Sequence, residues 1–569
     1  MKRIFLTTSP LLAPLARMVI RFRFGTALLL GLTAAVGAVP SLADTHDITS
    51  YGATANNGSD DTAAINSAIN AASAGDTVYF PAGTFDISGT VNGKSGVTLA
   101  GAGQASTTLK KMGTTVGPMI GVSGKSNVTI RDMTINGNSS SFGNGIEVTG
   151  GSSNILVSSM AVRDIAPDDA WGPHGVIFYG ATDSEVSDCT IFNIGITDKW
   201  GAGIRFGGAA NRNKALRNAI HDTGRGGIMG YESTDLIIKD NKIWDVGLAV
   251  FAITIETGGM CHRSLIENNT VDSWISVDRS DYVAVRGNTI SDKTYIYAFS
   301  YCGLELAGGS NCVFTDNVVD DGQQSGISIS TAAVPVEYSY FGYNTIKACA
   351  FVGSQLQGNS SAPVEKIYFY NTSFQNTTYG LHSPLYPKSE GNGIRMNTYC
   401  NNIVLDACNI SGNAKLGMFL IQPGVDQLSM VNNSIQNNGG AAFVGYSGYS
   451  ALEMTNNTIS GNADNSAPAA ASFNNNKPTA VISSVASANV GQAISFDSSS
   501  SSDSDGSIAH RLWDFGDGIP VDTTSASHAY SVAGTYRVTL IVWDNSGRAA
   551  RAEKSVVVSR ITTEKGNQP

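Results

Sequence analysis

Three acidic side chains recur at matching places in short strand-like segments of the chain, namely Glu256, Asp278 and Glu305. Apolar residues dominate the second and fourth places of these segments, so the third and fifth side chains should face solvent. Cleavage of a glycosidic bond needs one protonated acid for the leaving oxygen and one carboxylate for water or for the sugar. We therefore predict that these three residues are catalytic. The segments are Ala252–Glu256, Trp274–Asp278 and Gly303–Ala307.

The expected spacing of these acids follows if the segments stack on consecutive coils. Glu256 and Asp278 share the fifth place, so their Cα atoms should lie about 5 Å apart. Glu305 occupies the third place of the next segment, which puts it about 8 Å from Asp278. Carboxylates this close repel one another, so at least one pKa should be raised or a cation should bind. We predict no required cofactor and no metal ligand, although clustered acids could hold Ca²⁺. A solvated face with no role is the alternative.

A second group of candidates lies in the segment that leads into the same face. Asp168 and Asp169 are predicted as further catalytic residues, because loops beside a rigid strand surface often carry function. An Asp-Asp pair followed by a His resembles the polygalacturonase-like hydrolases. That family's separate Asp-Asp and Gly-His-Gly coils are not reproduced here, which leaves the assignment open. The side chains predicted to bind substrate are Trp171, His174, Tyr179, Arg205, Arg225, Tyr231, His262 and Arg279.

A repeat in the middle of the chain indicates the elements that must position these side chains. An Asn followed by an alternating, largely β-branched segment recurs at intervals of 19 to 29 residues, apart from one gap of 89 that has room for further coils. Such a period with short strands predicts one solenoid coil per repeat. Asn tolerates the left-handed conformation, and stacked Asn amides can hydrogen-bond from coil to coil. The repeated residues are Asn218, Asn241, Asn269, Asn288, Asn317, Asn344, Asn433 and Asn457.

The beginning of the repeat region predicts a cap. Asp60 or Asp61 is a good N-cap for a helix that starts at Thr62, and this helix would cover the open end of the stack. The segment from Ile48 to Thr107 resembles the N-terminal part of the pectate-lyase-type right-handed parallel β-helix superfamily. The resemblance implies an all-β solenoid with an N-terminal capping helix. Members of that superfamily include glycoside hydrolases, polysaccharide lyases and phage tailspikes.

The last part of the chain has a different pattern. Its Trp-Asp-Phe-Gly-Asp-Gly run, Trp513–Gly518, resembles the PKD domain, an immunoglobulin-like β-sandwich, and that resemblance implies a spacer or adhesive role. Asp514 and Asp517 could hold a metal or, as we favour, could cap turns. The predicted organisation is a signal peptide (1–43), the β-helix (44–461), a linker (462–477), the PKD domain (478–559) and a tail (560–569).

The chain ends and the overall charge narrow the class of protein. Arg21 and Arg23 precede an apolar run that is too short to favour a membrane span, and a small-x-small site follows it, so we expect a secreted protein, extracellular or periplasmic. The net charge of −10 argues against nucleic-acid binding. The 7 cysteines include Cys302/Cys312 and Cys400/Cys408, which are close enough in sequence to pair, but burial as small hydrophobes is favoured.

These observations predict a glycoside hydrolase that acts on a polysaccharide. A polysaccharide lyase or uronan epimerase is the first alternative, since Arg side chains or Ca²⁺ could neutralise a uronate carboxylate. Against it, the Tyr-Gly-x-Asp-Pro-His motif of alginate epimerases and an obvious pectate-lyase calcium signature are missing. A non-catalytic glycan-binding adhesin is the second alternative. The oligomeric state stays open.

Overall fold

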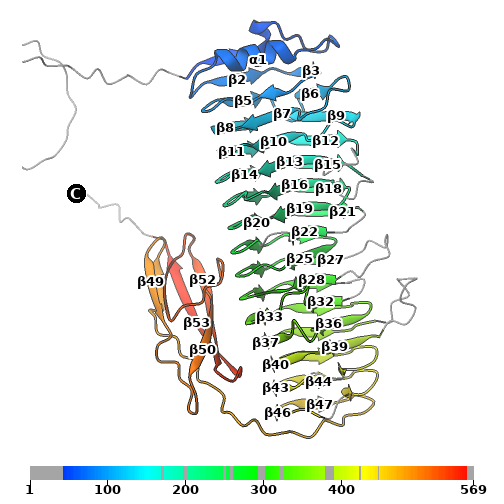
Figure 1. The fold of residues 1–569 in the computed structure, drawn as a ribbon, viewed down its shortest axis with the longest axis vertical. Helices are drawn as coiled ribbons and strands as arrows, with labels where there is room; N and C mark the ends of the chain where they lie inside the picture. The colour runs from blue at the N-terminus through cyan, green and yellow to red at the C-terminus, as the bar shows by residue number, and fades with distance from the viewer. Residues whose placement is uncertain are drawn as a thin grey trace, which may run out of the picture. The chain divides into compact units, whose positions relative to one another are not determined.

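The computed structural model describes residues 43–167, 172–196, 201–247, 251–256, 261–291, 302–320, 325–378, 390–421, 425–445 and 448–560, and for Phe251, Ile255 and Glu256 the backbone only. Between β1 (Thr45–Asp47) and β47 (Thr458–Ser460) the described strands form three parallel sheets, which we call A, B and C. One coil contributes a strand to each sheet in turn, as β14 (Glu185–Ser187), β15 (Thr190–Ile194) and β16 (Ala202–Gly207) do. Figure 1 shows the coils stacked in chain order. The predicted all-β solenoid is confirmed.

Sheet C contains the segments that were singled out by their acidic residues. Its strands pair in parallel, each with the strand of the next coil. They are β4 (Val91–Asn92), β7 (Ile120–Ser123), β10 (Ile146–Thr149), β13 (His174–Tyr179), β16, β19 (Gly226–Tyr231), β22 (Phe251–Glu256), β25 (Trp274–Asp278), β28 (Cys302–Ala307), β32 (Ser325–Ser330), β36 (Val352–Gln357), β39 (Asn392–Met396), β42 (Met418–Leu420) and β45 (Phe443–Gly445).

Columns of apolar side chains fill the inside of the solenoid. In sheet C, Ile228, Ile253 and Ile275 lie in register on consecutive coils, and all three are fully buried. Phe178 and Phe206 stack with ring centroids 5.7 Å apart. Because alternate residues of a strand point to opposite faces, this inward column forces the residues between its members to face outward. The core therefore fixes which side chains can form a site.

The repeated Asn residues form a buried ladder, as predicted. The backbone N–H and the side-chain amide of Asn218 both donate to Oδ1 of Asn241, at 2.9 and 3.0 Å, and the pattern continues coil by coil through Asn344. The left-handed conformation falls on the residue before each ladder Asn, for example Arg217 with φ 55° and Asp240 with φ 58°. The Asn side chains thus serve the hydrogen-bonded stack, and their neighbours make the turn.

The N-terminal end of the stack is capped by α1 (Thr62–Ala71), which begins at the predicted residue. Ile65, Ala68 and Ile69 of this helix are buried against the solenoid core. The two acids before it have separate tasks. Asp60 Oδ1 accepts the Thr62 N–H at 3.0 Å, whereas Asp61 Oδ1 accepts the Thr54 N–H at 2.8 Å. The helix hides the apolar end of the first coils from water.

The C-terminal part folds as a β-sandwich, as predicted. A four-stranded sheet of β48 (Ser487–Asn489), β53 (Ala549–Ser559), β52 (Gly534–Asp544) and β50 (Ile508–Asp514) faces a pair made of β49 (Ala493–Asp497) and β51 (Ser525–Ala529). Asp514 Oδ1 accepts the Gly516 N–H at 2.9 Å, and Asp517 contacts His528 Nε2 at 2.7 Å. Both acids therefore have structural partners in the turn, which fits the favoured interpretation as turn caps.

The sandwich packs on an apolar stripe of sheet A. Outward residues of β30 (Val313–Thr315), β34 (Ser339–Gly342), β37 (Val364–Tyr370) and β40 (Cys400–Asp406) form one buried cluster with sandwich residues. The same outward column stays apolar on the three coils before Val313, becomes polar at Lys214 on the coil before those, and is polar again at Ser429 after Val404. The cluster comprises Val313, Tyr340, Tyr368, Val404, Leu512, Ile541, Trp543 and Ala549. The sandwich is thus seated on the solenoid by matching apolar surfaces, which a mobile spacer would lack.

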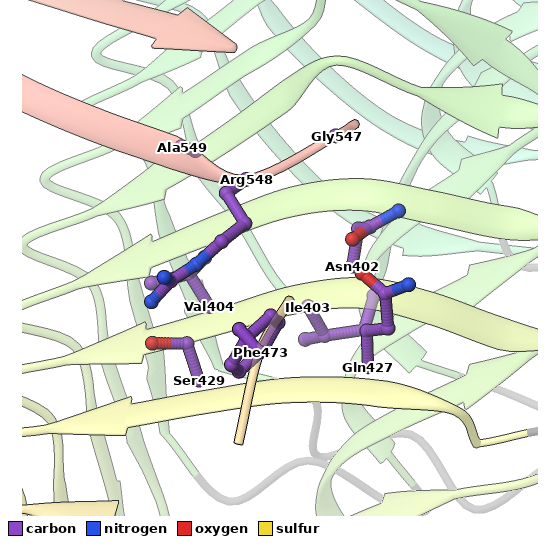
Figure 2. A pocket seen from close by; sticks show the side chains of 9 residues that line it. All are labelled: Asn402, Ile403, Val404, Gln427, Ser429, Phe473, Gly547, Arg548 and Ala549. Carbon is purple, nitrogen blue, oxygen red and sulfur yellow. The ribbon is translucent and has the colours of Figure 1, made fainter. Parts of the chain in front are cut away.

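One edge of this contact leaves a very small cavity. Figure 2 shows Arg548 reaching from the sandwich past Phe473 toward sheet A, with Asn402 and Gln427 on the other side. The guanidinium lies 4.1 Å from the Phe473 ring centroid and pairs with Glu453 at 2.7 Å. The cavity measures about 10 Å³, which is the room that one water molecule needs. The predicted linker, 462–477, therefore contributes packing at this edge through Phe473.

The described residues also bear on the cysteines and on helices that could cross a membrane. All 7 cysteines lie among them, each is buried, and none forms a disulfide, so the two sequence-adjacent pairs are not bridged. No helix in the described ranges is long and apolar enough to span a membrane.

Candidate active site

The register of sheet C decides how the predicted acids lie relative to one another. Glu305 of β28 is paired with Ser276 of β25, two residues before Asp278. Glu256 ends β22, and the pairing of Ile255 with Val277 brings it beside Asp278. Asp278 and Glu305 thus lie on neighbouring coils with the offset of two residues that the alignment predicted, and the backbone of Glu256 lies on the coil before Asp278. Cα atoms of Glu305 and Asp278 are about 8 Å apart by strand spacings.

Glu305 has an unusual environment for a carboxyl group. Its side chain is half-buried, and Ser276 Oγ donates a hydrogen bond to its Oε2 at 2.6 Å. Loss of hydration raises the pKa of Glu305 from an ordinary 4.5 to about 7, although the Ser276 hydrogen bond opposes part of this rise. The negative charge of Asp278 adds to the increase. A carboxyl group with this pKa carries its proton in much of the population at neutral pH.

Asp278 is held differently. Arg279 directs Nε to Asp278 Oδ1 at 3.3 Å in a charge-assisted contact. Gly308 supports the pair, because a Cβ at this position would come within 3.2 Å of Arg279 Cγ. The face therefore combines a carboxyl group of raised pKa, Glu305, with an aspartate that pairs with Arg279, on adjacent coils. Such a pair can protonate a leaving group and polarise water.

Ser276 is a site residue that the sequence reasoning missed. It occupies the third place of its segment, which is the same place that Glu305 occupies on the next coil. Thr254 precedes Ser276 in this column, and Ser328 follows Glu305. The sequence alignment already placed this hydroxyl group directly opposite Glu305, but only acidic residues were selected from that face.

Aromatic and basic side chains lie on the coils before these acids. Arg205 is only 8% exposed, and its guanidinium lies 5.9 Å from the ring centroid of Tyr231. Tyr231 pairs in register with Glu256, which links this group to the acids. Tyr179 is 55% exposed and its ring lies on Gly208, where a Cβ would approach the ring to 2.6 Å. Flat, exposed aromatic rings of this kind suit sugar stacking.

The remaining predicted residues lie at strand ends and turns or outside the described ranges. His174 begins β13 and is buried, with its N–H donated to Asn144. Arg225 precedes β19 and donates its backbone N–H to Gly201. His262 lies on the turn toward sheet A, 3.4 Å from Asp281. The candidates Asp168, Asp169 and Trp171 fall outside the described residues. No group of three or more His, Cys, Asp or Glu arranged for a metal occurs in the described parts of the chain, and the Ca²⁺ prediction stays untested.

Family models match three consecutive parts of the chain. Residues 46–275 match "Rhamnogalacturonase A/epimerase, pectate lyase-like", residues 273–506 match "Right handed beta helix region", and residues 475–559 match "PKD domain".

Curated relatives match only a short stretch. The microbial collagenase of Vibrio alginolyticus is 41% identical over 87 residues, which make up 15% of this chain and 11% of the collagenase. Collagenase ColA of Clostridium perfringens is 42% identical over 84 residues, 15% of this chain and 8% of that protein. This chain therefore spans about a tenth of the length of these relatives.

Two solved structures show a weak similarity to this chain. The A-module of the Azotobacter vinelandii mannuronan C-5 epimerase AlgE4 is 17% identical, covers 71% of this chain and 98% of its own length, and has a TM-score of 0.37. The catalytic domain of a GH87 α-1,3-glucanase is 17% identical, with 56% and 65% coverage and a TM-score of 0.44. These likenesses concern the fold alone.

Proposed function

Because the chain is a pectate-lyase-like right-handed β-helix protein with a PKD domain, we propose that it is a secreted glycoside hydrolase that cleaves a polysaccharide on the outer face of sheet C. One observation carries the proposal: Glu305, with its pKa raised to about 7, lies one coil from Asp278, which pairs with Arg279. Paired carboxyl groups whose pKa values differ are the arrangement that glycosidic cleavage needs. The predicted signal peptide, 1–43, supports export.

The roles follow from the two environments. Glu305 donates its proton to the oxygen of the leaving sugar, and Ser276 orients the carboxyl group through its hydrogen bond. Asp278, with Glu256 beside it in register, acts on water or on the anomeric carbon. Tyr179 supplies an exposed ring against which a neighbouring sugar can stack. The charge that develops on the sugar is stabilised by the carboxylate.

A product assay tests this proposal against its alternatives. The mature protein is incubated with a panel of neutral and acidic polysaccharides, and reducing ends are measured together with the ultraviolet absorbance of an unsaturated uronate. New reducing ends without that absorbance are expected. Glu305→Gln and Asp278→Asn should each abolish product, whereas Ser328→Ala, in the same column on the other side of Glu305, should not. Full activity of both acid variants would refute the assignment.

Elimination or epimerisation of an acidic glycan is the second candidate. The observation that favours it is the buried Arg205 in the same outward column, because a fixed guanidinium can neutralise a uronate carboxylate. Elimination would give reducing ends together with the ultraviolet absorbance. Epimerisation would give neither signal but would change the sugar's proton NMR spectrum. Binding without any product would identify an adhesin.

A further inference from the structure

A second cavity lies where the sandwich meets the solenoid, and it is much larger than the one in Figure 2. It has a volume of about 280 Å³. The solenoid contributes the end of β26 (Ala284–Arg286) and the residue after β30, and the sandwich contributes the turn after β50 and the start of β52. The lining residues are Arg286, Asp316, Asp514, Gly516, Thr535, Tyr536 and Arg537. We call this cavity the seam cavity.

The charged groups of the seam cavity are fixed before any ligand arrives. Arg286 and Asp514, 7% and 5% exposed, form an ion pair at 2.5 Å. Arg286 also approaches Glu267 at 3.6 Å and the carbonyl oxygen of Gly518 at 3.4 Å. On the opposite wall Arg537 pairs with Asp316 and lies over a tyrosine ring, 3.6 Å from its centroid. Groups held in this way lose little freedom when a ligand binds.

The pairing of these charges selects the class of ligand. Each guanidinium in the wall faces a carboxylate, so an anion that approaches Arg286 or Arg537 also meets Asp514 or Asp316. An uncharged ligand with neighbouring hydroxyl groups avoids this repulsion. Its hydroxyl groups can donate to the carboxylate oxygens and accept from the guanidinium N–H groups at the same time. Thr535 adds a hydroxyl group, and Tyr536 adds part of an aromatic surface.

The size of the cavity agrees with one sugar ring. Its volume of about 280 Å³ lies just below the range of about 300–1,000 Å³ that is usual for drug-sized ligands. The cavity in Figure 2, at about 10 Å³, has no room for a sugar. We propose that the seam cavity is a second binding site, which takes one neutral glycosyl residue. The choice of a sugar as the ligand class rests on the proposed function.

The position of the seam cavity indicates the role of this second binding site. Arg286 ends β26, the strand that follows the β25 strand of Asp278, but Arg286 lies on sheet A and Asp278 on sheet C. A sugar in the seam cavity is therefore on another side of the solenoid from the one being cleaved. The site would bind a stretch of polysaccharide next to the one being cleaved. Residues of both the sandwich and the solenoid would form this binding site.

Ligand-observed NMR on the full mature chain tests the proposal. The probes are methyl glycosides of glucose, galactose, mannose and rhamnose, with galacturonate and glucuronate as anionic probes. At least one neutral glycoside should show saturation transfer from the protein. The experiment measures only the binding of a methyl glycoside, so its outcome does not depend on whether the protein cleaves a polysaccharide. Glu305→Gln should therefore bind the methyl glycoside as the wild type does.

Three variants locate the bound glycoside. Thr535→Trp puts a large ring into the cavity from an exposed position and should abolish the signal, whereas Thr523→Trp, an exposed position of the same sandwich outside the cavity, should keep it. Asp316→Asn keeps the size of the side chain and should weaken binding about tenfold, as loss of a charged hydrogen bond does. The proposal is overturned if no neutral glycoside binds, if only the uronates bind, or if Thr535→Trp binds as tightly as Thr523→Trp.

Discussion

Replacing Glu305 by Gln should make the protein more stable at alkaline pH, although it removes the proposed acid. The rise in pKa from 4.5 to about 7, at about 1.4 kcal/mol per pH unit, corresponds to about 3 kcal/mol. Below the ordinary pKa both the folded and the unfolded chain keep the proton, so the ionisation of Glu305 does not change the free energy of unfolding. Between the two values the unfolded chain releases the proton first, and the folded state loses stability as the pH rises. Above about pH 7 the loss is complete.

Gln cannot ionise, so the variant escapes this loss, while its amide oxygen can still accept the Ser276 hydrogen bond. Thermal unfolding of the wild type and of Glu305→Gln should therefore nearly coincide at about pH 4 and diverge by up to about 3 kcal/mol at about pH 8, with the variant more stable. Glu147→Gln, from the same outward column several coils earlier, controls for the loss of a carboxylate on this face. Equal stability of wild type and Glu305→Gln at both pH values would refute the burial argument.

Three other substitutions probe the supporting structure. Ser276→Ala removes the hydrogen bond that opposes the raised pKa of Glu305, so the alkaline limb of the pH profile of kcat/KM should move to higher pH. Ser328→Ala is the control, and the same alkaline limb in both variants would contradict this role of Ser276. Asn288→Ala leaves buried donors of the preceding ladder residue without an acceptor and should lower the free energy of unfolding by about 1–3 kcal/mol in urea titrations; no loss would mean that the ladder is not stabilising. Gly208→Ala should displace the ring of Tyr179 and raise KM more than it lowers kcat, and a wild-type KM would count against sugar stacking there.

Much of the solenoid could be predicted from the sequence because it follows from local periodicity. The Asn spacing showed the coils, and the alternation in strands showed which residues face outward. The same reasoning placed Glu305 two residues out of step with Asp278, which the register confirms. Because consecutive coils stack in register, the offset between two residues in the repeat gives their separation on the sheet. The prediction therefore needed little knowledge of contacts between distant segments.

What the sequence did not show depends on contacts between distant segments. Arg286 and Asp514 pair across 228 positions, and neither has a local signal for the other. The apolar stripe with Tyr340 and Tyr368 on sheet A was present in the sequence, but its partner could be recognised only once the sandwich was placed. The raised pKa of Glu305 was expected for one of the acids, yet which acid depends on how deeply each is buried.

The central claim is that Glu305 protonates the leaving sugar. Its most direct test is kcat/KM for Glu305→Gln on whichever polysaccharide the wild type cleaves. General acid catalysis contributes typically about 10²–10⁴-fold, so the account predicts a loss of that size. A variant that cleaves the polysaccharide as fast as the wild type would contradict it.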